Sequence, residues 1–198
     1  MKNLFLSALC AALCLLSCAV SAQAVAPDES TFMEDMIRAA CANDLQAGRQ
    51  AEACRAEKIA QQDLEVAPVA FEDLLLLAKI IQAEAGSAWL SEQWKMSVGE
   101  VVLNRVASPE FPNTVREVIE QPGQYYGPSS TFFRNLRPSE EAARLAQRLL
   151  EGERVLNEPS VVFQANFPLG GGVFLHLIDS QLGSTYLCYS AHPELYAA

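Results

Sequence analysis

The segment from Phe71 to Ala85 is hydrophobic on nearly every side of the helix that it can form. Leucine occupies positions 74–77 and isoleucine positions 80 and 81, so apolar side chains point in almost all directions around the axis. A helix that is apolar all round is buried in the centre of a domain. Gly86 follows and is a typical residue for ending a helix. The pattern therefore predicts a central buried helix over residues 71–85.

Three more helices are predicted after it. Ser91 can cap a helix that continues to about Val106. This helix has apolar faces and a polar stripe, which consists of Gln93, Ser97, Glu100 and Asn104. Helical patterns also cover 115–120 and 138–151. The segment 121–137 between them is rich in proline, glycine and aromatic residues, and it reads as a long loop of the kind that is often functional.

The pattern changes after Pro159, where short runs of β-branched and aromatic residues replace the helical period. These runs are 161–163, 173–175 and 185–189, with glycines at 170–172 and 183 as turns. Helices followed by a small sheet define the α+β class. We predict a mainly helical domain with a small C-terminal antiparallel sheet over residues 71–198.

The first 70 residues have a different character. Residues 1–24 have a positive start, an apolar run and an Ala-Gln-Ala cleavage site, which together indicate a secretory signal peptide. Cys18 lies in a weaker lipoprotein-like box, so a lipid anchor at Cys18 is the alternative, and a buried mature helix is a third reading. Residues 25–70 are expected to form a hairpin of two short helices, joined near 43–48, and a linker. The expected location is therefore outside the cytoplasm, in the periplasm, the cell envelope or the medium.

Removal of the signal peptide leaves three cysteines, Cys41, Cys54 and Cys188. Exported proteins enter an oxidising compartment in which disulfides persist. We therefore expect a Cys41–Cys54 disulfide that staples the helical hairpin. Cys188, left unpaired in a strand pattern, is expected to be a buried apolar side chain rather than a reactive thiol.

Charge and missing motifs exclude several classes of function. The chain has 14 basic and 24 acidic residues, a net charge of −10, whereas nucleic-acid binding needs clustered lysine and arginine. Only two histidines are present, and no zinc-binding, nucleophile-elbow or phosphate-loop motif occurs. We expect no metal, no other cofactor and no nucleic-acid partner.

Glu84 is the main candidate for chemistry. It lies at the end of the apolar helix, where low polarity and the negative end of the helix dipole both disfavour a charged carboxylate. A carboxyl group with a raised pKa can protonate a leaving oxygen, as glycoside cleavage requires. On position alone, an exposed helix-end residue without a catalytic role is an equally good interpretation. Glu100 and Asn104 could face a cleft beside Glu84, although a buried structural network is slightly favoured for Glu100.

Several motifs, in this order, resemble the spore cortex-lytic cell wall hydrolase family. They are AKIIQAEAG at 78–86, VGEVVLNRV at 98–106, SPEFPNTVREV at 108–118, QPGQ at 121–124, VVFQ at 161–164, GGV at 171–173 and YLCY at 186–189. The resemblance implies a lysozyme-like α+β domain that cleaves the MurNAc–GlcNAc β-1,4 bond of peptidoglycan. It also implies that Glu84, in the AEA motif, is the catalytic acid and base. The Tyr125-Tyr126-Gly127 sequence after QPGQ departs from the Phe and Ser that are common there.

The leading hypothesis is a monomeric lytic transglycosylase or muramidase that acts on peptidoglycan through Glu84. The alternatives are a non-catalytic glycan-binding module and a different wall enzyme, such as an amidase. The residues expected to bind substrate are Glu100, Asn104, Gln121, Gln124, Tyr125 and Gln164.

Overall fold

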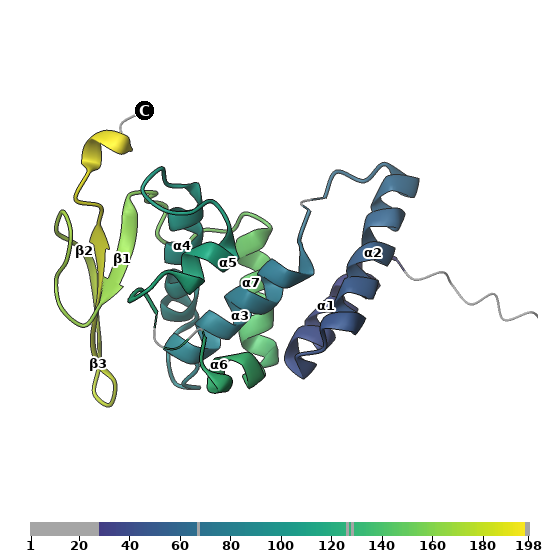
Figure 1. Ribbon diagram of the computed structural model, residues 1–198, viewed down its shortest axis with the longest axis horizontal. Helices are drawn as coiled ribbons and strands as arrows, with labels where there is room; N and C mark the ends of the chain where they lie inside the picture. The colour runs from purple at the N-terminus through teal and green to yellow at the C-terminus, as the bar shows by residue number, and fades with distance from the viewer. Residues whose placement is uncertain (1–27, 67, 126, 128, 197–198) are drawn as a thin grey trace, which may run out of the picture.

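The computed structural model describes residues 28–196 except 67, 126 and 128 (Figure 1). The predicted signal peptide and the alternative lipid anchor at Cys18 therefore lie outside the described residues. None of the described helices is both long enough and apolar enough to span a membrane.

Seven α-helices precede a three-stranded sheet in the described part of the chain, so the predicted α+β class is confirmed. The elements are α1 (Glu29–Ala42), α2 (Leu45–Gln62), α3 (Phe71–Ala85), α4 (Glu92–Ala107), α5 (Val115–Glu120), α6 (Thr131–Asn135), α7 (Glu140–Leu150), β1 (Val161–Ala165), β2 (Val173–Asp179), β3 (Gly183–Tyr189) and a 3₁₀ turn (Pro193–Leu195). The helix predicted to begin after Ser91 does so, and the Ser91 hydroxyl accepts a hydrogen bond from the Trp94 amide at 3.2 Å.

The long loop predicted over 121–137 contains a helix that the sequence analysis missed, α6. It has only five residues, too few for a hydrophobic period to be visible. Its start does carry a local signal, because the Ser130 hydroxyl accepts a hydrogen bond from the Phe133 amide.

The helix α3 runs through the centre of the molecule, as predicted. Leu74, Leu77 and Ile81 have no exposed surface or almost none. Both α4 and α7 pack against α3. Gly99 permits this close packing, since a Cβ at that position would lie 2.5 Å from the Leu149 Cδ1 atom.

The hairpin of α1 and α2 packs on α3 and α7, on the side of the helical body away from the sheet (Figure 1). Met36 and Ile37 of α1 are buried in the same apolar cluster as α3. Gly48 of α2 lies so close to the Phe71 ring that a Cβ there would be 2.1 Å from it. The hairpin therefore shares the main apolar core with α3 and α7.

The expected Cys41–Cys54 disulfide is wrong for this structure, in which both cysteines are free. Cys54 lines a cavity together with Phe32, nine positions before Cys41 on α1. At 1.5 Å per residue, nine positions correspond to about 13 Å along the helix. A disulfide needs Cα atoms about 5–6 Å apart, so the antiparallel hairpin places the two thiols too far from each other.

The sheet has the strand order β1-β3-β2, and both pairings are antiparallel, as predicted. Val161 and Leu187 pack with Val101 and Leu156 in a small second core between the sheet and α4. Cys188 of β3 is fully buried, and its sulfur accepts a hydrogen bond from the Leu169 amide. This agrees with the expected role of Cys188 as a buried side chain.

Candidate active site

Glu84 occupies the last turn of α3, one residue before the helix ends. Its side chain is open to solvent, yet enough protein surrounds the carboxyl group that partial desolvation raises its pKa. The direction of this shift is the one expected from the sequence. The carboxyl group therefore combines two properties that a general acid needs, namely access for a substrate and a stabilised protonated form.

Tyr125 lies close enough to Glu84 for the two side chains to interact electrostatically. Burial is the main reason why the pKa of Tyr125 rises to about 12, and the negative charge of Glu84 adds to the increase. The positive charge of Arg105 opposes it, with the guanidinium 5.2 Å from the centre of the Tyr125 ring. The loop after α5 thus brings a neutral phenol hydroxyl to the neighbourhood of Glu84.

Arg105 links this loop to the sheet. Its Nε donates a hydrogen bond of 2.6 Å to the carbonyl of Val162 on β1. Its guanidinium also lies over the Phe111 ring, which makes an edge-to-face contact with Phe163. The stack of Tyr125, Arg105 and Phe111 therefore holds the loop at Tyr125 against the beginning of the sheet.

Four buried side-chain atoms have no hydrogen-bond partner within the described residues. They are Arg105 Nη1, Gln121 Oε1, Tyr125 Oη and Gln164 Oε1. An unpaired buried polar group costs about 1–3 kcal/mol, so a group of them calls for a reason such as a ligand. Three of the four belong to residues that the sequence analysis predicted to bind substrate.

The amide residues of the predicted site differ in position. Gln121 and Tyr125 line a cavity of about 480 Å³ beside the end of α5. Gln124 is exposed, and its backbone N–H donates to the carbonyl of Gln121, which shapes the turn. Gln164 lies on β1 with its amide oxygen buried.

Glu100 and Asn104, which the sequence suggested as substrate-binding residues, are both buried and bonded to the backbone of a neighbouring segment. Glu100 is 1% exposed, and its carboxylate accepts hydrogen bonds from the backbone N–H groups of Val155, Leu156 and Asn157 at 2.6, 2.9 and 3.1 Å. The Asn104 amide donates to the carbonyls of Glu158 and Val161, both at 3.0 Å. Both side chains fasten α4 to the chain that leads into β1. For Glu100 this is the structural role that the sequence slightly favoured.

Trp89 is a candidate that the sequence analysis missed. It lies in the short connection after Glu84 and is 56% exposed. Exposed tryptophan rings bind the apolar faces of sugars because they bury a large area at little conformational cost. A tryptophan five positions after a candidate acid was a visible signal.

No group of histidine, cysteine, aspartate and glutamate side chains among the described residues is arranged to hold a metal ion.

The described site thus combines an exposed carboxyl group whose pKa is raised, a phenol that it influences, and a loop with buried polar atoms that have no partner among the described residues. A protein-family model for cell wall hydrolases matches residues 91–166. The predicted resemblance to the spore cortex-lytic cell wall hydrolase family is thereby confirmed over this segment. The match begins after Glu84, so it covers Gln121, Tyr125 and Gln164 but not the candidate acid. No curated protein and no solved structure matched the chain.

The family match indicates a hydrolase that acts on peptidoglycan, and therefore a site of action outside the cytoplasm. Because the match starts at residue 91, it does not include Glu84.

Proposed function

We propose that this protein cleaves the glycan strands of peptidoglycan at the MurNAc–GlcNAc β-1,4 bond, with Glu84 as the single acid and base. The main support is the position of Glu84, whose reachable, partly desolvated carboxyl group lies beside Tyr125 and the loop with unpaired polar atoms. The family match over 91–166 supports the substrate, and the helix-rich fold with a small sheet is compatible with a lysozyme-like domain.

In the proposed reaction, the protonated carboxyl group of Glu84 gives its proton to the glycosidic oxygen as the C–O bond breaks. The resulting carboxylate then acts as a base. In a muramidase it removes a proton from a water molecule whose oxygen bonds to the anomeric carbon. In a lytic transglycosylase it removes the proton of the muramic acid 6-hydroxyl, whose oxygen bonds to that carbon and closes a 1,6-anhydro ring. Either step returns the proton to Glu84, so the residue ends the cycle as it began.

The surroundings of Glu100, the second candidate carboxyl group, favour a mechanism in which only one carboxyl group acts. Glycosidases with two catalytic carboxyl groups need both of them to face the bond that breaks. Both oxygens of Glu100 are engaged by backbone N–H groups, and its side chain is shut away from solvent.

The remaining residues of the site are proposed to bind the sugar chain. The Tyr125 hydroxyl and the amide oxygens of Gln121 and Gln164 have unused hydrogen-bonding capacity for sugar hydroxyl and acetamido groups. Gln124 is exposed in the same loop as Gln121 and Tyr125, and the exposed Trp89 ring, five residues after Glu84, offers a flat surface for a sugar.

The test is the replacement Glu84→Gln in the full chain, with purified wall as substrate. The variant should fold normally, because Glu84 is exposed, and it should release no soluble fragments. Glu57→Gln, at an exposed position on α2, is the matched control and should release fragments at the normal rate. Normal release by Glu84→Gln would refute the assignment.

The products separate the two forms of the reaction and the competing functions. An anhydro product is lighter than the hydrolysis product by one water, so mass spectrometry distinguishes a transglycosylase from a muramidase. Intact glycan strands with retained binding to wall would favour a non-catalytic binding module. Free peptide stems and sensitivity to chelators would favour an amidase.

The proposed location is the periplasm, the cell envelope or the medium, and the proposed active form is a monomer. The mass of the mature protein distinguishes cleavage after Ala24 from lipidation at Cys18. Its sedimentation behaviour tests the monomer.

A further inference from the structure

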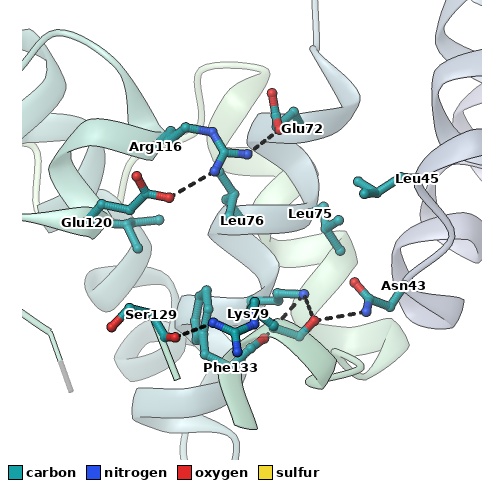
Figure 2. A pocket seen from close by; sticks show the side chains of 12 residues that line it. Asn43, Leu45, Glu72, Leu75, Leu76, Lys79, Arg116, Glu120, Ser129 and Phe133 are labelled. Carbon is teal, nitrogen blue, oxygen red and sulfur yellow. Dashed lines mark hydrogen bonds and ion pairs between the residues drawn. The ribbon is translucent and has the colours of Figure 1, made fainter. Parts of the chain in front are cut away.

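A second cavity, of about 410 Å³, lies between the α1–α2 turn and the helices α3, α5 and α6 (Figure 2). The described residues that line it include neither Glu84 nor the residues proposed above to bind sugar. Asn43 from the α1–α2 turn lies at its edge, so a part of the chain outside the matched family segment forms one of its walls.

One end of the cavity is cationic and rich in hydrogen-bond donors. Lys79 of α3 is 5% exposed, and its ammonium group donates to the carbonyls of Phe133 and Arg134 at 3.3 and 2.9 Å. The Asn43 amide donates to the same Arg134 carbonyl at 3.0 Å. These carbonyls belong to the last turn of α6, so Lys79 also caps that helix. Two of the three ammonium hydrogens are used in this way.

The positive charge at this end is not balanced by a carboxylate. Within the described chain, Lys79 bonds to the two carbonyls, and the Arg134 guanidinium bonds to the Ser129 carbonyl and the Thr131 hydroxyl. Burial without a counter-ion lowers the pKa of Lys79. An anion bound here would therefore stabilise a charged group that the fold leaves desolvated.

The other end of the cavity has the opposite character. Arg116 of α5 is held between two carboxylates, Glu72 of α3 and Glu120 of α5 (Figure 2). The three side chains together carry one negative charge. A ligand that spans the cavity would thus meet donors and positive charge at one end and excess acid at the other.

The cavity adjoins the candidate active site. It shares Glu120 and Ser129 with the cavity that Gln121 and Tyr125 line. Along α3, Lys79 precedes Glu84 by five residues, which is about 7.5 Å of helix rise.

We propose that this cavity binds the peptide stem of the substrate, with a stem carboxylate on the Lys79, Asn43 and Arg134 end and an amino group toward the Glu72 and Glu120 end. The proposal rests on the proposed function, since a peptidoglycan stem is attached to the sugar beside the cleaved bond. Its carboxylates and amino group match the two ends of the cavity. The α1–α2 hairpin then completes a binding site in addition to filling the core.

The test uses the full chain with Glu84→Gln, so that no substrate is consumed, and an isolated stem tetrapeptide titrated by NMR. The peptide with free carboxylates should bind about tenfold more tightly than its fully amidated counterpart, as expected for one charged hydrogen-bonded contact. Added Lys79→Met should weaken binding of the free peptide about tenfold and leave the amidated peptide unaffected. Arg134→Gln, at an exposed position that does not threaten the fold, should act in the same direction.

Lys58→Met on α2 is the matched control, because Lys58 does not line this cavity, and it should bind both peptides normally. Equal binding of the free and amidated peptides, or unchanged binding by both Lys79→Met and Arg134→Gln, would overturn the proposal. In the protein with Glu84 intact, Lys79→Met should slow cleavage of peptide-bearing glycan but not of glycan stripped of its stems. If Glu84 proves not to be catalytic, the peptide titration still reports on the cavity, so the two proposals fail separately.

Discussion

Replacing Glu100 by glutamine distinguishes a structural carboxylate from one that acts on substrate. The two oxygens of Glu100 accept three backbone hydrogen bonds from residues 155–157, the segment that leads from α7 toward β1. Asn157 in this segment has a left-handed backbone, with φ of 53°. The carboxylate thus stabilises a turn that contains a left-handed residue, a backbone conformation that is uncommon for residues other than glycine.

The expected cost follows from these contacts. Glutamine keeps one oxygen, which can replace the oxygen that accepts from Val155 and Leu156. Its NH₂ group would then face the Asn157 N–H. Because both groups are donors, the Asn157 N–H would lose its acceptor. One unpaired N–H costs about 1–3 kcal/mol, and weakening two bonds to a charged acceptor adds about 1 kcal/mol. The loss should be about 3 kcal/mol, which lowers the Tm of a chain of this size by about 6–12 °C.

The assay combines thermal unfolding, followed by circular dichroism, with cleavage of purified wall well below the Tm of the variant. Glu100→Gln should unfold at a lower temperature and still cleave while it is folded. Glu57→Gln supplies the control for the loss of one surface charge. A normal Tm together with abolished cleavage would refute the structural role and return Glu100 to the catalytic site.

Three further predictions concern the site and the hairpin. Tyr125→Phe should leave stability within about 1 kcal/mol, because the hydroxyl has no partner in the described protein, but should slow wall cleavage about tenfold. Burial raises the pKa of Glu84, so the acid form persists to higher pH than for an ordinary glutamate. The cleavage rate should therefore fall as pH rises through that pKa, and a rate that climbs there would contradict Glu84 as the acid. Gly48→Ala should lose about 1–3 kcal/mol in urea unfolding, since its Cβ would overlap a buried ring.

Most of the fold could be predicted from the sequence because its strongest signals are local. The all-apolar pattern of 71–85 predicted the central helix, and the capping serine at 91 and the glycines at 170–172 marked ends and turns that the structure contains. The disulfide could not be predicted from composition and spacing. Whether the disulfide can form depends on how far each cysteine lies from the turn along its own helix. The residue at which the turn falls sets these two distances.

The candidate site was predictable in part. Gln121, Tyr125 and Gln164 were selected from the sequence, and each has a buried polar atom without a partner among the described residues. Glu100 and Asn104 looked like a polar stripe facing a cleft, because helical spacing shows that residues share a face but not what covers it. Here the chain before β1 covers them. The role of Glu84 remains a prediction.

The shared core of the hairpin and the central helices has a practical consequence for dividing this chain into pieces. The family match spans 91–166, yet that segment lacks α3 and includes β1 without β3, the strand with which β1 pairs. A fragment cut at those limits would expose apolar side chains of α4 and α7 and leave one strand edge open. A shortened recombinant protein, or a fusion that transfers this activity to another protein, should therefore begin before α1 and extend beyond β3.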